Sequence, residues 1–170
     1  DSVIIVNNLS GEHLMVVADG MGGHKAGEVA SSIVVNGLAD KFKKLERVGE
    51  KQDAVNWIRK NVSELNDAIF KYTDEFVESK GMGTTLVLSI VTDDYILFGN
   101  VGDSSGFVMK KGSLYKVTKD HTLVNLLVET GELTKEEAEK IKYCADALEV
   151  TRTDAIMKGI DLVKKELDKK

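Results

Sequence analysis

The chain has 170 residues, of which 42% are hydrophobic and 30% charged, so a disordered chain is excluded and one packed domain over residues 1–170 is expected. Its formal net charge at pH 7 is −5, and its lysines are scattered or terminal rather than gathered on one face. This charge pattern argues against nucleic acid as a partner.

The first part of the chain reads as a hairpin followed by two helices. Two β-rich runs, Ser2 to Asn7 and His13 to Ala18, flank a loop that contains glycine, which predicts a hairpin. Apolar residues then recur at helical spacing from Glu28 to about Leu45, and again from Ala54 to Tyr72. Two long consecutive helices are therefore expected after the hairpin.

Strands return after these helices. β-rich runs over residues 84–101 and 106–118 surround the turn sequences Asp93-Asp94 and Lys111-Gly112-Ser113, which predicts two further hairpins. From His121 onward the pattern is helical, with Thr134 and Glu137 forming a capping box. Segregated strands and helices favour an α+β fold, with helices packed on antiparallel sheets.

The apolar runs of this chain are all short. They fall far below the roughly 18 residues of a membrane span, so we expect no membrane partner. No targeting peptide is recognisable, although the chain opens with Asp1 rather than Met, which leaves room for an upstream segment. The single Cys144 excludes a disulfide framework, fits a cytoplasmic location and is expected to be a small buried or half-buried residue.

In residues 16–28, VVADGMGGHKAGE, an apolar strand is followed by an aspartate and four glycines. Glycines weaken regular structure, so the backbone freedom here serves something other than packing. The Asp19 carboxylate and the Gly20 carbonyl are oxygen ligands of the kind that Mg²⁺ and Mn²⁺ prefer. The same residues also allow a loop that merely turns the chain, with Glu28 near a helix N-terminus for dipole reasons.

Four segments combine into a family pattern: Asp-Gly-Met-Gly-Gly-His at 19–24, Gly-Met-Gly-Thr-Thr at 81–85, Val-Gly-Asp-Ser at 101–104 and Asp-His-Thr-Leu-Val at 120–124. In this order they resemble successive motifs of the bacterial type-2C metal-dependent protein serine/threonine phosphatases. The resemblance covers about residues 1–140. It implies a β-sandwich of two antiparallel sheets flanked by helices, in α-β-β-α layers, with a dinuclear Mg²⁺ or Mn²⁺ centre at one end.

The resemblance also implies roles for individual residues. Asp19 is similar to the carboxylate that bridges the two cations and organises catalysis, and Gly20 to a carbonyl ligand. Asp1 lies where the family's Asn-Glu-Asp element would end and is similar to a further metal carboxylate. Asp103 resembles the ligand of a third, weaker cation, and His24 the group that protonates the leaving alkoxide.

The activity that the resemblance implies is hydrolysis of phosphoserine and phosphothreonine on proteins by water activated between two cations. The implied partners are phosphorylated protein substrates and a cognate protein kinase pathway. A cysteine-based phosphatase is not supported, because no Arg-rich phosphate loop follows Cys144.

The chain departs from the family's pattern in several places. An Arg before the first acidic motif is missing, Ser105 stands where Arg usually follows Gly-Asp-Ser, and two later carboxylate elements do not occur. Three explanations stay open: a piece of a longer enzyme, a truncated variant that lost catalysis, or replacement of the missing ligands by Asp146, Asp154 or Asp161. We favour the first, because otherwise one sandwich sheet would lack strands and leave apolar faces uncovered.

Two alternatives to a general protein phosphatase remain. One is a catalytically silent binding module with the same fold but no complete metal centre. The other is a sporulation-type regulatory phosphatase of the same superfamily, acting on an anti-anti-sigma factor.

Overall fold

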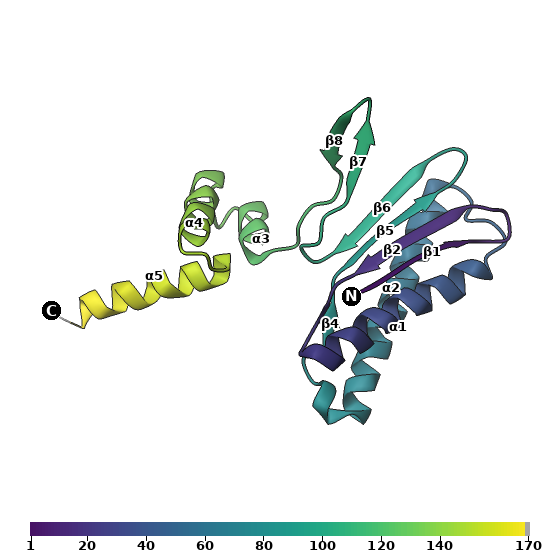
Figure 1. Ribbon diagram of the computed structural model, residues 1–170. Helices are drawn as coiled ribbons and strands as arrows, with labels where there is room; N and C mark the ends of the chain where they lie inside the picture. Colours follow the sequence, from purple (N-terminus) through teal and green to yellow (C-terminus); the bar gives the residue numbers. More distant parts are fainter. Residues whose placement is uncertain (169–170) are drawn as a thin grey trace. The chain divides into compact units, whose positions relative to one another are not determined.

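A computed structural model describes residues 1–168 of the chain (Figure 1). The chain divides into two compact units, with the boundary between Asp120 and His121. The expectation of one domain over residues 1–170 stays a prediction. Among the described residues, no helix has the length and apolar character that crossing a bilayer would demand.

The first unit is built on a four-stranded antiparallel sheet in the order β1-β2-β5-β6. Its strands are β1 (Ser2–Asn7), β2 (His13–Ala18), β5 (Leu86–Val91) and β6 (Ile96–Val101). In the first hairpin, Ser2 lies opposite Ala18 and Asn7 opposite His13. The predicted hairpins at 2–18 and 84–101 are thus confirmed, except that Thr84 belongs to a separate short strand.

Two long helices cover one face of this sheet (Figure 1). They are α1 (His24–Lys43) and α2 (Lys51–Glu75), and a short 3₁₀ turn, η1 (Val77–Ser79), follows α2. Helix α1 begins four residues before the predicted Glu28. Gly23 is its N-cap residue, with φ of 79°, a backbone conformation that glycine adopts without strain.

The core lies between the sheet and these helices. Alternate strand residues point into it, because successive side chains of a strand face opposite sides of the sheet. The largest fully buried side chains are Phe42, Leu14, Leu38, Leu88 and Ile90. The Phe42 ring meets the Trp57 ring edge to face, with centroids 5.5 Å apart, so α2 is tied to α1 by an aromatic pair.

The opposite face of the same sheet is apolar and exposed. Val3 and Ile5 of β1 are 70% and 67% exposed, and Val17 of β2 is 50% exposed. The α+β class is confirmed. The resemblance implies two sheet layers. The described residues contain one four-stranded sheet, covered by its helices, and two small two-stranded sheets.

The two small sheets lie in the connections of the first unit. Strand β3 (Gly20–Met21) pairs with β4 (Gly83–Thr84). The predicted hairpin at 106–118 is confirmed as β7 (Phe107–Lys110) paired with β8 (Ser113–Lys116). The first of these pairings joins the two glycine-rich motifs to each other.

The second unit is helical, as predicted from His121 onward. Its helices are α3 (Leu123–Glu129), α4 (Lys135–Ala147) and α5 (Arg152–Leu167). Each begins after a threonine whose hydroxyl accepts a backbone N–H bond from the first turn, which satisfies an otherwise unpaired donor. Cys144 is exposed on α4, so its expected burial is wrong; the neighbouring Ala145 makes the buried contact instead.

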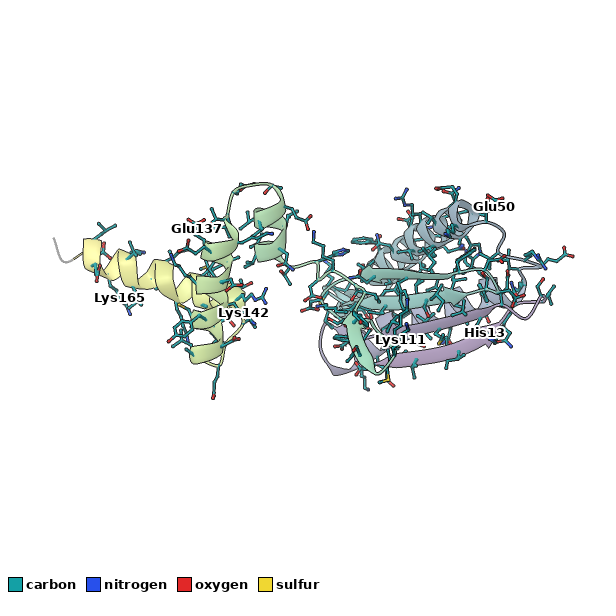
Figure 2. All side chains as sticks on the ribbon, turned by 90° about the horizontal axis from the view of Figure 1, so that it is seen from above. His13, Glu50, Lys111, Glu137, Lys142 and Lys165 are labelled. Atoms are coloured by element: carbon teal, nitrogen blue, oxygen red, sulfur yellow. The ribbon has the colours of Figure 1, made fainter. Side chains whose placement is uncertain are left out.

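The capping box of α4 has a pH consequence. Glu137 lies in the first turn of α4 (Figure 2), and its carboxylate accepts bonds of 2.8 Å from both the N–H and the hydroxyl of Thr134. These bonds, the backbone one foremost, lower the pKa of Glu137 below 4.5. Because the folded pKa is the lower one, this stabilisation is complete above pH 4.5 and is lost as the pH falls through the folded pKa.

We therefore expect the first turn of α4 to fray in acid. Amide hydrogen exchange at residues 135–138, followed from pH 6 downward and corrected for intrinsic rates, measures this fraying. Glu137→Gln should remove most of the acid dependence, because an amide does not titrate in this range. An unchanged acid dependence in Glu137→Gln would assign it to another carboxylate, such as Glu136, which pairs with Lys140.

Candidate functional site

The first two acidic candidates meet at one end of the sheet. Asp1 directly precedes β1, and Asp19 directly follows β2. Since Ser2 lies opposite Ala18 in an antiparallel pair, the next positions outward bring Asp1 beside Asp19. Both residues are exposed. Two exposed carboxylates therefore lie side by side at the ends of neighbouring strands.

A pocket of about 480 Å³ opens beside these strand ends. Its lining is Asp1, Gly20, Met21, Gly22, Gly23 and Glu28. Asp1 and Gly20 thus share a pocket, as the ligand hypothesis requires, whereas Asp19 is not among the lining residues. Glu28 was assigned only a helix-dipole role from sequence. The structure puts Glu28 in the pocket as its second carboxylate beside Asp1, because α1 starts earlier than predicted and Glu28 falls in its second turn.

The glycine-rich loop is shaped by a close backbone contact. A Cβ atom on Gly20 would lie 1.9 Å from the carbonyl oxygen of Gly27, and one on Gly27 would lie 2.6 Å from the carbonyl oxygen of Gly20. Strand β3 therefore crosses α1 with main chain against main chain, which no larger residue allows at this separation. This contact holds the Gly20 backbone at the pocket beside Glu28.

The Thr84-Thr85 pair binds the backbone of Asp19. The Asp19 N–H donates to the Thr85 hydroxyl at 3.1 Å, and the Thr85 N–H donates to the Asp19 carbonyl at 2.8 Å. The Thr84 hydroxyl lies within donating distance of the same carbonyl, at 3.0 Å, and of the Thr85 carbonyl, at 2.9 Å. From the sequence, this pair ends the 81–85 motif and begins a β-rich run, with no partner indicated. The structure joins the 81–85 motif to the 19–24 motif through hydrogen bonds.

The Gly-Asp-Ser motif meets the same threonine. The hydroxyls of Thr85 and Ser104 are 2.7 Å apart, within hydrogen-bond distance. Asp103, the residue before Ser104, is exposed in the loop after β6. Three of the four motifs are therefore linked through Thr85.

Two of the four motifs also contain a histidine. His24 is the first residue of α1, but its side chain lies outside the described part of the structure. His121 is the first residue of the second unit. The proposed replacement ligands Asp146, Asp154 and Asp161 belong to that unit too. In the part of the chain that the structure describes, no three His, Cys, Asp or Glu side chains form a group able to hold a metal ion.

The donors in the pocket nonetheless suit a hard cation. Mg²⁺ is commonly bound through one or two carboxylates and keeps several waters, so it does not need three acidic side chains. Asp1 and Glu28 bring carboxylates to the pocket, and the Gly20 backbone lies beside them. These residues fit part of a ligand set for Mg²⁺ or Mn²⁺.

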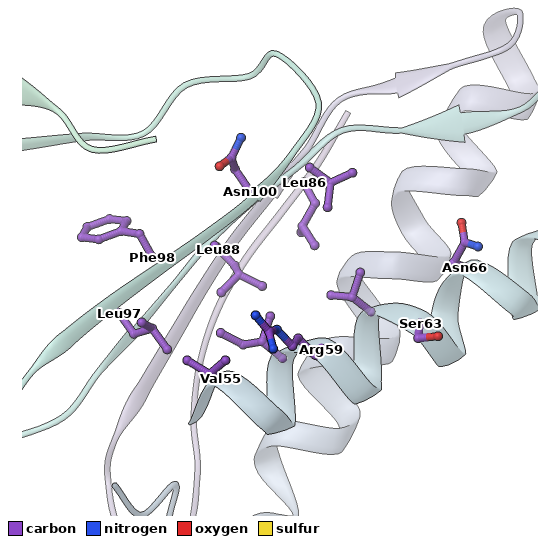
Figure 3. A pocket seen from close by; sticks show the side chains of 13 residues that line it. Val55, Arg59, Ser63, Asn66, Leu86, Leu88, Leu97, Phe98 and Asn100 are labelled. Carbon is purple, nitrogen blue, oxygen red and sulfur yellow. The ribbon is translucent and has the colours of Figure 1, made fainter. Parts of the chain in front are cut away.

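A larger cavity of about 530 Å³ lies between α2 and strands β5 and β6 (Figure 3). Leu86, Leu88 and Leu97 line its sheet side, and Arg59 and Ser63 lie on its helix side. None of the acidic candidates lines it. No carboxylate among the described residues lines this cavity and Arg59 brings a positive charge to it, so cation-dependent chemistry is better placed at the smaller pocket.

Known proteins are similar to this chain in sequence and in fold. A family model described as protein phosphatase 2C matches residues 1–156, which extends beyond the four motifs. A serine/threonine phosphatase, Stp, of Listeria welshimeri is 39% identical over 134 residues, covering 79% of this chain and 53% of the relative. The chain thus spans about half the length of these curated relatives.

Two solved structures are similar as well. The serine/threonine phosphatase Stp1 of Staphylococcus aureus is 41% identical, with a TM-score of 0.69, over 80% of this chain and 53% of that one. The catalytic domain of the phosphatase PstP, solved with two manganese ions, is 34% identical, with a TM-score of 0.63, over 81% and 56% of the two chains. This chain belongs to the protein phosphatase 2C family.

Proposed function

We propose that this chain carries part of the active site of a protein serine/threonine phosphatase that depends on Mg²⁺ or Mn²⁺. The observation that carries the proposal is the register of the first hairpin, which brings Asp1 beside Asp19 at the pocket shared by Asp1, Gly20 and Glu28. The relatives named serine/threonine phosphatases, and the PstP structure with manganese, support the same reading.

In this proposal the residues have distinct tasks. Asp1, Asp19 and the Gly20 carbonyl hold a pair of divalent cations, which when bound supply an activated hydroxide and neutralise phosphate charge. Asp103 holds a third, weaker cation at the neighbouring loop. His24 donates a proton to the leaving alkoxide oxygen of the serine or threonine product. Glu28 adds negative charge to the pocket and attracts the cations to it.

The proposed substrates are phosphoserine and phosphothreonine side chains of proteins, in opposition to a cognate protein kinase. The pocket is open to solvent at the end of the sheet. Such a pocket suits a phosphorylated segment on a protein surface better than a small molecule that must be enclosed. We also propose a cytoplasmic location, supported by a single cysteine that fits a reducing compartment.

Metal removal tests this function. The 170-residue chain, dialysed against EDTA, should release no phosphate from a phosphothreonine peptide, and added Mn²⁺ should restore release. Circular dichroism before and after EDTA controls for unfolding, and calorimetry measures Mn²⁺ binding directly. Phosphate release that persists in excess chelator would contradict the metal mechanism. Absence of both Mn²⁺ binding and hydrolysis would favour the silent binding module.

A further inference from the structure

The Thr85 hydroxyl lies between two of the motifs. It accepts the Asp19 N–H bond at 3.1 Å and lies 2.7 Å from the Ser104 hydroxyl. A hydroxyl has one donor and two acceptor positions, so Thr85 can accept from Asp19 and donate to Ser104 at once. Its side chain is half-buried, which shields these bonds in part from competing water.

The bonds at Asp19 fix its backbone from both sides. Thr85 binds the N–H and the carbonyl of Asp19, and the Thr84 hydroxyl lies 3.0 Å from that carbonyl. A backbone with its donor and its acceptor both engaged has little freedom to rotate. The direction in which the Asp19 side chain leaves the strand end is therefore set by residues 65 and 66 positions further along the chain.

The Gly-Asp-Ser loop can lie close to Thr85 because Gly102 has no side chain. A Cβ atom there would lie 2.9 Å from the Thr85 Cγ2 atom, and the φ of Gly102 is +94°. Gly102 thus permits the approach that lets Ser104 reach the Thr85 hydroxyl. The loop that carries Asp103 is tied to the strand end that carries Asp19 through this one side chain.

We propose that Thr85 is a positioning residue: its hydroxyl holds Asp19 in the orientation that binds a divalent cation and couples it to the Asp103 loop. The inference rests on the proposed function, because it assigns Asp19 to a cation site. Groups that hydrogen-bond to a metal ligand without touching the metal typically raise metal affinity about 10- to 100-fold.

Three variants test the proposal. Thr85→Val keeps the shape but removes the hydroxyl, and should weaken Mn²⁺ binding, measured by calorimetry, about 10- to 100-fold. It should also speed hydrogen exchange of the Asp19 amide. Thr85→Ser keeps the hydroxyl and should restore both values to near wild type. Thr92→Val is the matched control, since the half-buried Thr92 accepts backbone N–H bonds at the other end of β5.

The outcomes separate this inference from the proposed function. Mn²⁺ affinity and Asp19 exchange in Thr85→Val that equal those of wild type would overturn the positioning role. An equal loss in Thr92→Val would also overturn it, because the effect would then be general destabilisation. If the wild-type chain binds no Mn²⁺, the proposed function fails, and Asp19 exchange alone decides whether Thr85 fixes this backbone.

Discussion

Asp19→Asn is expected to reduce Mn²⁺-dependent hydrolysis of a phosphothreonine peptide by about 10³-fold, which corresponds to ~4 kcal/mol of transition-state stabilisation. The substitution removes one negative charge at the strand end where Asp1 and Asp19 meet. It keeps the size of the side chain, and Asp19 is exposed, so the fold should be preserved. Initial rates of phosphate release at saturating Mn²⁺ measure the loss.

An exposed aspartate on the same unit provides the control. Asp40 lies on α1 outside the pocket, and Asp40→Asn removes the same charge from the molecule. Its rate should stay within about two-fold of wild type, because exposed charges at a distance are screened by salt. If Asp19→Asn kept a comparable rate, Asp19 would have no part in catalysis and the proposed site would be wrong.

Gly27→Ala is expected to destabilise the first unit by about 3 kcal/mol, even though alanine normally favours a helix over glycine by about 1 kcal/mol. The sign reverses because the new Cβ atom would lie 2.6 Å from the Gly20 carbonyl oxygen and 2.7 Å from its carbon. Main-chain atoms cannot move aside as a flexible side chain can. Either β3 leaves α1 or the helix shifts, and both change the pocket.

Urea denaturation of wild type and variant measures the free energy of unfolding of this unit. Gly159→Ala in α5 is the matched control, since a Cβ atom there meets nothing within 4 Å and should stabilise its helix slightly. Mn²⁺ affinity should fall in Gly27→Ala and stay unchanged in Gly159→Ala. A Gly27→Ala protein more stable than wild type would show that β3 and α1 separate without cost.

The helix starts show how far local sequence patterns reach. Thr134 and Glu137 predict the start of α4 correctly, because a capping box acts between residues three apart. Helix α1 begins earlier than its apolar pattern, because its first turn, with Lys25 and Gly27, carries little of the periodic signal. Because of that error, Glu28 was not predicted as a pocket residue, since its position depends on where the helix begins.

Contacts between distant segments were harder to predict. The meeting of Asp1 and Asp19 follows from a hairpin that the sequence predicts, because equal strand lengths bring the two ends together. The bonds of Thr85 to Asp19 and Ser104 depend on a pairing of β2 with β5 that no local pattern specifies. The roles of Asp1, Asp19, Gly20, Asp103 and His24 stay predictions.

The pairing of β2 with β5 also bears on how the site is assembled during folding. Val17 lies opposite Val87, so both long helices must be accommodated in the intervening chain before these strands can join. Contacts of such large sequence separation form slowly, because the entropy of closing the loop is lost before the pairing compensates for it. A nascent chain that has only completed its first hairpin therefore possesses both aspartates but not the threonines that orient one of them.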